Sequence, residues 1–455
     1  MPEPSREHGE LLRKLVHIGV GSLALLLRFL TWPQAAAMAA GALLFNWQLL
    51  PRLGGRALWR EHERRRGYPP GILFYPLSVL GLVLLFREDL AKAAACWGVL
   101  AVGDGMAGLL GRALGGPRLP WNRDKSAAGT LAFVLFGTPA AALLMAFTLG
   151  LPLASWASPR ILGLCLPLAL ACALVESMPT TLDDNLTVPL AGALTLLLLG
   201  QAQPPLLLSD PGLGGRALVG LAVNAAVALL AHRAGSIDVP GALSAVLIGT
   251  LITASLGLAG FALMAAFFVI GSAATRLGHR VKAARGIAQE KGGARGWRNA
   301  WANGGVPTLL ALMAGCTAGE TRALFVLAYA ASVATAAADT GSSEVGKAYG
   351  RRTLLITTLR PVPPGTEGAV SLEGTLAGLG AGAVVAFLGA ALGLYGAVPA
   401  ALVALAALFG SLAESVIGTQ AERRGWFNND QLNALNTAIG GAAVCLLVRV
   451  LELRP

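Results

Sequence analysis

The chain has 455 residues, of which 55% are hydrophobic and 13% are charged, and its mean hydropathy is +0.65. Soluble domains carry about 25% charged residues, so this composition excludes a soluble globular protein and indicates an integral membrane protein. The net charge of +11 would suit nucleic acid, but the basic residues lie between apolar runs, where membrane topology accounts for them. We therefore expect a lipid bilayer, and no nucleic acid, among its partners.

Apolar runs of about 20 residues, long enough to cross a bilayer as helices, recur along the whole chain. They lack the alternation of barrel strands, so we predict an all-α polytopic fold. The count is about 15 transmembrane helices, in two parallel repeats of about seven with one linking helix. In chain order, the predicted spans begin near residues 15 and 33, continue with two that lead to residue 103, and then cover 129–177 as a pair, 186–200, 218–231 as the link, 242–253, 259–275, 306–315, 323–338, 376–392, 398–417 and a last run that ends near 450.

Basic loops alternate along the chain with loops that are poor in Lys and Arg. The basic segments are the N-terminus, 52–66, 112–125, 276–298, 347–360 and 423–424, and all fall on one face under this count. Basic loops stay in the cytoplasm. We therefore expect a multi-pass protein of the cell (inner) membrane, with the N-terminus and every motif loop cytoplasmic and the C-terminus outside. No cleavable signal peptide is expected behind the charged N-terminus.

The same motifs occur in the same order in both halves of the chain, which predicts two membrane domains, 1–205 and 206–455. Each half carries an Asp in a Gly-rich run, a Ser-x-x-Gly-Thr motif, a Glu-Ser pair, and a run rich in amides and acids. These motifs begin at Asp104, Ser126, Glu176 and Asp183 in the first half and at Asp339, Ser371, Glu414 and Asn428 in the second.

Acidic residues near glycines and basic side chains suit phosphoryl transfer, which depends on positioning and on charge stabilisation. Asp104 with Asp183 or Asp184 would offer hard oxygen ligands for Mg²⁺. Glycines beside Asp104 would let backbone amides approach phosphate, and Lys125 would neutralise phosphate charge. Neither half contains GxxxxGK[ST], which excludes a P-loop.

Each of these residues also has a purely structural explanation. Gly111 or Gly346 could let two helices pack closely. Asp104 could cap a helix, and His17 could lie in a packed interface. Because the whole combination occurs in both halves on one predicted face, we favour function.

Several motifs carry a resemblance to known families. In the first half these are E-x-x-RK-x-x-H from Glu10 to His17, then GILFYPLSV, GDGMAGLLGRALGG, DKSAAGT and DDNLTVPL. Through them, residues 10–200 resemble the phytol kinase and dolichol kinase family of CTP-dependent polyprenol kinases. In the second half they are ADTGSSEVGKAYG, RPVPPGTEGAVSLEGTLAGLGAG, ESVIGTQ and NNDQLNALNT. Through these, residues 218–449 resemble the membrane family that contains phytyl-phosphate kinase.

The two resemblances imply a bifunctional isoprenoid kinase. The first half would phosphorylate phytol or a related prenyl alcohol to its monophosphate, and the second half would make the diphosphate. CTP would be the co-substrate and Mg²⁺ the metal. Such diphosphates feed tocopherol and quinone biosynthesis, and the alcohol would come from salvage.

Motif chemistry and the resemblance together imply roles for single residues. The implied catalytic residues are Asp104, Lys125, Ser126, His17, Asp339, Lys347, Ser371 and Glu373. The implied nucleotide-binding residues are Gly103, Gly108, Gly111, Lys14, Asn185, Thr366, Gly365, Asn429 and Asn433. The implied metal ligands are Asp104, Asp183, Asp184, Glu176, Asp339, Glu344 and Glu414.

Two positions depart from these patterns. Ala128 stands where the first family has Glu, although the second half keeps Glu373. Val370 stands where the first half has Lys125. The first half could therefore have weakened catalysis, or Asp124 could compensate for the missing Glu. Equally, one half could be a scaffold for the other. Three further functions stay open at this point: a transporter built from two repeats, a CTP-using lipid cytidylyltransferase, and a kinase for another alcohol such as dolichol, undecaprenol or farnesol.

Overall fold

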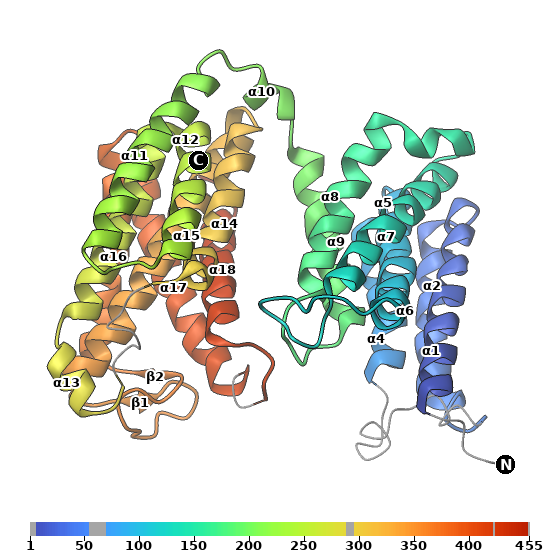
Figure 1. Ribbon diagram of the computed structural model, residues 1–455, viewed down its shortest axis with the longest axis horizontal. Helices are drawn as coiled ribbons and strands as arrows, with labels where there is room; N and C mark the ends of the chain where they lie inside the picture. The colour runs from blue at the N-terminus through green and yellow to red at the C-terminus, as the bar shows by residue number, and fades with distance from the viewer. Residues whose placement is uncertain (1–5, 54–69, 288–294, 422–423, 454–455) are drawn as a thin grey trace. The chain divides into compact units, whose positions relative to one another are not determined.

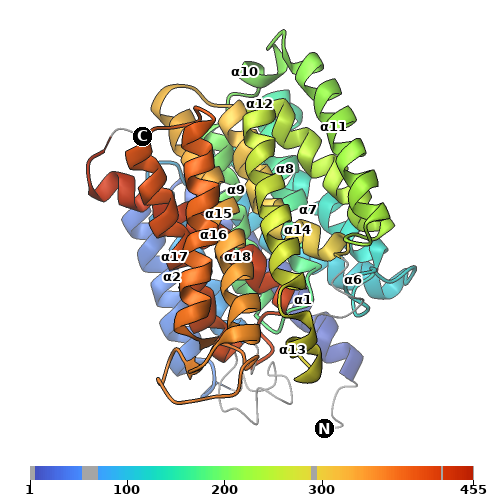
Figure 2. The same ribbon diagram turned by 90° about the vertical axis from the view of Figure 1, so that its left-hand side faces the viewer.

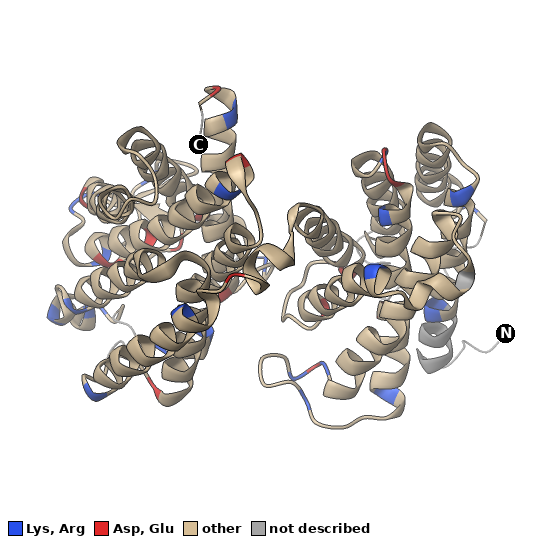
Figure 3. Ribbon diagram, turned by 90° about the horizontal axis from the view of Figure 1, so that it is seen from above, with Lys and Arg blue, Asp and Glu red and all other residues tan. Residues whose placement is uncertain are grey.

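The computed structural model describes residues 6–53, 70–287, 295–421 and 424–453. Contacts divide the chain into two compact units, 1–200 and 201–455, where the sequence predicted domains of 1–205 and 206–455. Nine helices of the described residues are long and apolar enough to cross a membrane, which agrees with the predicted all-α membrane fold. Lys, Arg, Asp and Glu occupy only a small part of the ribbon (Figure 3). The total of about 15 spans and the parallel repeat stay predictions.

The named elements of unit 1 among the described residues are all helices (Figure 1). Its elements are α1 (Arg6–Gly21), η1 (Ser22–Arg28), α2 (Trp32–Leu44), η2 (Phe45–Leu49), α4 (Pro70–Leu85), α5 (Leu90–Gly98), η4 (Val99–Asp104), α6 (Gly105–Ala113), α7 (Ala127–Thr148), η5 (Leu153–Ala157), α8 (Pro159–Glu176) and α9 (Asp184–Gln201). Three elements, α5, η4 and α6, form one continuous helix over Leu90–Ala113, which we call the Asp104 helix.

The Asp104 helix lies at the centre of unit 1. Its apolar window is 72% buried, compared with 44% for α7 and 39% for α8. Its buried face is made of small residues, among them Ala94, Ala95 and Cys96. Lipid tails are as apolar as these side chains, so close van der Waals packing of small residues holds membrane helices together. This packing fixes Asp104, at the end of η4, inside the unit.

Unit 2 contains the second set of motifs. Its elements are α10 (Pro204–Leu208), α11 (Leu213–Arg233), α12 (Val239–Arg276), α13 (His279–Ala284), α14 (Trp297–Gly315), α15 (Gly319–Tyr349), β1 (Leu354–Leu355), β2 (Ala369–Val370), α16 (Leu372–Ala391), α17 (Ala397–Ala421) and α18 (Asn429–Val450). The two short strands are antiparallel, with Leu354 opposite Val370 and Leu355 opposite Ala369. The hairpin and α13 lie at the same end of the unit, and α10 lies at the other end (Figures 1 and 2).

The long helix α12 is interrupted at Gly257, whose backbone has φ +70° and ψ −170°. Glycine adopts this conformation without steric cost. The interruption falls between 242–253 and 259–275, which the sequence predicts as separate spans. The helix α15 is the counterpart of the Asp104 helix, because it carries Asp339 and its apolar window is also 72% buried.

Candidate active sites

Asp104 is a buried acid with a basic partner from another helix. Its side chain is 4% exposed, and Lys14 Nζ donates a hydrogen bond to Asp104 Oδ2 at 2.7 Å. A Cβ at Gly108 would lie 2.8 Å from Lys14 Cε, so the glycine makes room for the lysine to reach the carboxylate. The π-helical turn η4 ends at Asp104, and such turns often mark functional sites. The pair neutralises a charge that would otherwise be costly to bury.

His17 approaches the same carboxylate, with Nε2 at 3.5 Å from Asp104 Oδ2. His17 Nε2 also lies 3.0 Å from the Leu100 carbonyl oxygen. A carbonyl only accepts, so in the neutral ring Nε2 carries the hydrogen and Nδ1 is left to accept a proton. The ring packs edge-on against Tyr75 at 4.8 Å, and Trp97 Nε1 donates to the Tyr75 hydroxyl at 2.8 Å. These contacts fix the orientation of the imidazole.

Ser126 is the N-cap of α7 and links α7 to α6 where the two helices cross. The Gly129 N–H donates to Ser126 Oγ at 3.2 Å, which is an N-cap, and Ser126 Oγ donates to the Gly111 carbonyl at 3.3 Å. A Cβ at Gly111 would lie 3.1 Å from Gly129 Cα. Gly111 therefore lets α6 and α7 pack closely, as the structural explanation requires. Gly111 and Ser126 also line the cavity described below, so both can have a second role.

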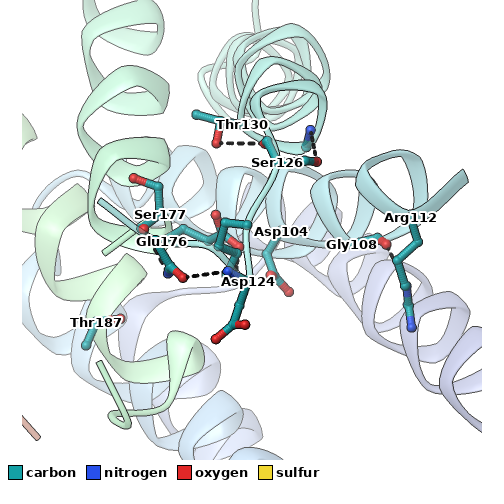
Figure 4. A network of polar contacts seen from close by, with 12 residues as sticks. Asp104, Gly108, Arg112, Asp124, Ser126, Thr130, Glu176, Ser177 and Thr187 are labelled. Carbon is teal, nitrogen blue, oxygen red and sulfur yellow. Dashed lines mark hydrogen bonds and ion pairs between the residues drawn. The ribbon is translucent and has the colours of Figure 1, made fainter. Parts of the chain in front are cut away.

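The loop before Ser126 is attached to the end of α8. Lys125 forms an ion pair with Glu176, whose side chain is 5% exposed. Trp121 Nε1 donates to Ser177 Oγ at 3.1 Å, and Asn122 Nδ2 donates to the Ser177 carbonyl at 3.1 Å. Figure 4 shows this loop beside Glu176, Ser177 and Asp104. The Glu-Ser pair thus holds the loop that delivers Lys125.

The two neighbouring acids of DDNLT take different positions. Asp183 Oδ1 accepts from the Asn185 backbone N–H at 3.0 Å and from Asn185 Nδ2 at 2.8 Å, so Asp183 turns inward to the helix start. Asp184, the first residue of α9, lines the cavity instead. Burial, together with the Asp104 carboxylate, raises the pKa of Asp184 to about 7. Burial alone would lower the pKa of Lys14, but the carboxylates of Asp104, Asp184 and Glu176 together outweigh it and raise that pKa.

A cavity of about 520 Å³ collects these groups in unit 1. Its basic side chains among the described residues are Arg13, Lys14, Arg112, Arg118 and Lys125. Its acidic side chains are Asp104, Asp124, Glu176 and Asp184. The other implied site residues that line it are His17, Gly108, Gly111, Ser126 and Asn185. Mixed charge of this density suits a metal–triphosphate complex, which carries both cationic and anionic groups.

The first cavity contains oxygen ligands of the kind that Mg²⁺ takes. Among the described residues, no group of three or more His, Cys, Asp or Glu is placed to hold a metal. Mg²⁺ usually takes one or two carboxylates and completes its shell with waters and substrate phosphates. Asp104 and Asp184 both line the cavity and interact electrostatically, so these two residues fit that pattern.

The second site repeats this arrangement between α15, α16 and α17. A cavity of about 130 Å³ is lined by Asp339, Lys347, Gly365, Thr366, Ser371, Glu414 and Asn429, all of which the sequence implied. Ser371 caps α16 by accepting from the Gly374 N–H at 3.1 Å, as Ser126 caps α7. A Cβ at Gly374 would lie 2.6 Å from the Ser342 carbonyl, so α15 and α16 also cross closely.

Two acids meet in this second cavity. Asp339 and Glu414 both line this cavity, and their carboxyl groups interact with each other. Asn436 Nδ2 donates a hydrogen bond to Glu414 from α18. Two adjacent carboxyl groups must share a proton or a cation, because like charges at this distance repel. The pair is therefore a candidate cation-binding position in unit 2.

Five implied residues lie away from the two cavities. Asp183 caps α9, and Gly103 faces Phe133, since an added Cβ would lie 2.9 Å from that ring. Glu373 accepts from the Arg351 N–H at 3.4 Å. Asn433 is buried outside the cavity lining, and Glu344 forms a buried ion pair with Lys282.

The cavities also include residues that the motif reasoning did not assign. Arg112 and Arg118 line the first cavity, and Glu367 and Ser411 line the second. Glu367 belongs to the PGTEGAVSLEGT run, and Arg112 follows Asp104 at the same spacing as Lys347 follows Asp339. These two signals were present in the sequence. Arg118 and Ser411 have no such signal, because loop folding and helix packing bring them to the site.

Comparisons with known proteins agree with a membrane protein and add named activities. The model of a family described as integral membrane protein DUF92 matches residues 222–441. An uncharacterized membrane protein of Synechocystis sp. is 44% identical over 43% of this chain and 76% of its own length. A chloroplastic farnesol kinase of Arabidopsis thaliana is 33% identical over 42% of this chain and 66% of its own length. A probable chloroplastic phytol kinase of Glycine max is 35% identical over 41% of this chain and 61% of its own length.

The chain thus spans less than two thirds of the length of each of the two named kinases. No solved structure matches it. The similarity to the Synechocystis protein covers most of that protein, and the family model covers the motifs from Asp339 to Asn436. The chain therefore belongs to the integral membrane protein DUF92 family.

Proposed function

We propose that this chain is a membrane isoprenoid kinase that phosphorylates a prenyl alcohol in unit 1 and the resulting monophosphate in unit 2. The observation that carries the proposal is the first cavity, in which Asp104, Lys14 and Lys125 lie together within a unit of apolar helices. The relatives named farnesol kinase and probable phytol kinase support an isoprenoid alcohol as the acceptor. CTP is proposed as the donor and Mg²⁺ as the metal, on the family resemblance alone.

In the first step, the alcohol oxygen forms a bond to the γ-phosphorus of the nucleotide. The bond from that phosphorus to the β–γ bridging oxygen breaks, and the nucleoside diphosphate leaves. The hydroxyl proton passes to His17 Nδ1, the nitrogen that is left free of the Leu100 carbonyl. Lys14 and Lys125 stabilise the charge on the phosphoryl oxygens, and both can exchange a carboxylate partner for phosphate. Mg²⁺ held by Asp104 and Asp184 would neutralise charge on the β- and γ-phosphates.

In the second step, an oxygen of the prenyl monophosphate takes the place of the hydroxyl. Unit 2 would supply Lys347 to the phosphoryl oxygens, and Asp339 with Glu414 would hold the metal. The products are the prenyl diphosphate and a second nucleoside diphosphate. The support for this step is local: each cavity lies where a Ser-capped helix crosses the buried helix that carries the motif Asp.

The test is a product assay on the purified full chain in detergent. Protein, Mg²⁺ and CTP labelled at the γ-phosphate are incubated with phytol, farnesol or geranylgeraniol, and lipid monophosphate is separated from diphosphate. Asp339→Asn should yield labelled monophosphate alone. Asp104→Asn should yield labelled diphosphate only when prenyl monophosphate is supplied. Each loss should be at least about 10²-fold, the usual effect of removing one charge-stabilising group.

The control variant is Glu88→Gln, because Glu88 has an 87% exposed side chain, forms an ion pair with Arg87, and lines neither cavity. It should match wild type. A parallel reaction uses CTP labelled at the α-phosphate. Release of pyrophosphate together with a labelled lipid would favour a cytidylyltransferase. Solute flux in proteoliposomes with no transfer of label would favour a transporter. Either result would overturn the kinase.

A further inference from the structure

Unit 1 contains another cavity, which adjoins the first cavity and is distinct from the one in unit 2. It has a volume of about 240 Å³ and lies between α1, η2 and α4. Its apolar wall is formed by Val16, Val20, Leu50, Ile72 and Tyr75, and we call it the tail groove. Val16 is 43% exposed and Val20 is 37% exposed, so the groove opens on the outer face of α1. In a membrane this face meets lipid tails.

The tail groove and the first cavity, which holds the charged side chains, share one wall. Arg13, His17 and Asn185 line both of them. Apolar side chains therefore lie on one side of this wall, and phosphate-binding chemistry lies on the other. An amphiphile with a long aliphatic chain and one polar end group would extend across it, with the end group at the shared wall. This matches an alcohol, with one chain and a small end group, better than a phospholipid, with two chains and a larger headgroup.

Asn185 is placed to receive that end group. It is 6% exposed, and no donor among the described residues reaches its Oδ1. Asn185 Nδ2 donates to Asp183 Oδ1 at 2.8 Å, and Ser78 Oγ donates to the Asn185 carbonyl at 2.6 Å. A flipped amide would turn its oxygen toward the Asp183 carboxylate, which repels it, so Oδ1 stays directed away. A buried acceptor in this position lacks a hydrogen-bond donor, and buried acceptors normally have one.

We propose that the tail groove holds the isoprenoid chain of the alcohol and that Asn185 Oδ1 accepts the hydrogen bond of its hydroxyl. This inference rests on the proposed function and names the substrate site of the first step. The Tyr75 ring, fixed by Trp97 and packed on His17, forms the rigid floor of the groove. The hydroxyl oxygen is thereby presented at the shared wall, beside His17 and facing the first cavity. Before the reaction the hydroxyl donates to Asn185 Oδ1, and during phosphoryl transfer it turns its hydrogen to His17 Nδ1.

The test uses a phytol analogue with a photoreactive diazirine in its chain, applied to the full chain in detergent with no nucleotide present. Cross-links should fall in the segments 16–20 and 72–75, and an excess of phytol should compete with them. Ile72→Trp, which fills the groove, should reduce cross-linking at least tenfold. Leu77→Trp is the matched control, because Leu77 is 42% exposed on the same helix but does not line the groove. It should cross-link as wild type does.

A kinetic arm tests the hydroxyl contact. Asn185→Leu keeps a similar volume and removes the acceptor, so the KM for phytol should rise about tenfold or more while the KM for the nucleotide stays within twofold. A purely structural role would instead move both constants or lower the amount of folded protein. If Ile72→Trp does not fold by gel filtration, Val20→Trp fills the same groove from α1.

The failures of this inference and of the kinase are distinguishable. Competed cross-links in the groove without any phosphate transfer would leave the site standing and overturn the kinase. Phosphate transfer by wild type, with unchanged KM for phytol in Ile72→Trp and cross-links elsewhere, would overturn the tail groove. Competition by phospholipid but not by phytol would also overturn it, because the groove would then be a lipid site.

Discussion

The substitution Glu344→Gln tests the most buried ion pair among the described residues. Lys282 and Glu344 have side chains that are 1% and 2% exposed, and they join α13 to α15. Lys282 Nζ also donates to the carbonyls of Ala274 at 3.2 Å and Thr275 at 2.8 Å. The substitution removes the only acidic partner of Lys282 in the described structure and leaves its two carbonyl acceptors.

The expected loss of stability follows from the charge that each substitution leaves buried without a partner. Removing one partner of a buried ion pair costs about 3–5 kcal/mol. Lys282→Met should cost a similar amount, because it leaves the Glu344 carboxylate buried without its cation. The double variant Lys282→Met, Glu344→Leu should recover most of the loss, since an apolar pair of similar volume replaces buried charges well.

The assay is denaturant unfolding of the four proteins in detergent, with and without Mg²⁺, followed by helical circular dichroism. The loss in Glu344→Gln should be equal in both conditions, because Glu344 lies outside the cavity of unit 2. The sequence implied a metal ligand at this position instead. Wild-type stability of Glu344→Gln without Mg²⁺, together with loss of a Mg²⁺-dependent increase, would refute the ion-pair reasoning and support the metal ligand.

Three further predictions concern the sites themselves. Lys125→Met should lower alcohol phosphorylation about 10²-fold or more in the γ-label assay, because the phosphoryl group loses a cation and the buried Glu176 loses its partner; an unchanged rate would exclude a role on phosphate. The pKa of Asp184 is raised to about 7, so between pH 3.8 and 7 the native state keeps a proton that the unfolded chain loses. Without metal, the free energy of unfolding should therefore fall as pH rises across this window, by at most about 1.4 kcal/mol per pH unit. Asp184→Asn should flatten that slope in denaturant titrations, and a slope of the same size would reject the assignment. Gly374→Val should destabilise unit 2 and abolish diphosphate formation, because the new Cβ would lie 2.6 Å from the Ser342 carbonyl; normal folding and activity would mean that α15 and α16 separate easily.

Helical periodicity explains part of what the sequence could predict. Asp339, Ser342 and Gly346 are spaced by three and four residues, so they share one face of α15, and all three line the second cavity. Glu344 follows Asp339 by five residues, which turns it by about 140° to another face. The helix assignment was sufficient to separate Glu344 from Asp339. The motif-based reasoning grouped them because it counted proximity in sequence and not rotation.

Other features of the sites depend on contacts that no local pattern contains. Asp183 and Asp184 are neighbours, and only the packing of the α9 start decides which one caps the helix and which one lines the cavity. The π-helical turn of η4 has no sequence signal in this run of small apolar residues. The pairing of Lys282 with Glu344 joins positions 62 residues apart. Sequence patterns are periodic and local, whereas these features come from tertiary packing.

The charges of the two cavities differ, and this difference bears on how strongly each proposed step depends on Mg²⁺. Among the described residues, the first cavity has five basic and four acidic side chains, whereas the second has Lys347 facing Asp339, Glu367 and Glu414. A neutral alcohol adds no charge to the nucleotide, and the first cavity has one more basic than acidic side chain, so its excess charge favours a triphosphate. A prenyl monophosphate adds about 1.5–2 negative charges near pH 7. The second cavity cannot offset them with one lysine, and its three acids oppose a free phosphate. An anion enters such a cavity only when cations occupy the acids first, so the second step should depend more steeply on Mg²⁺ than the first.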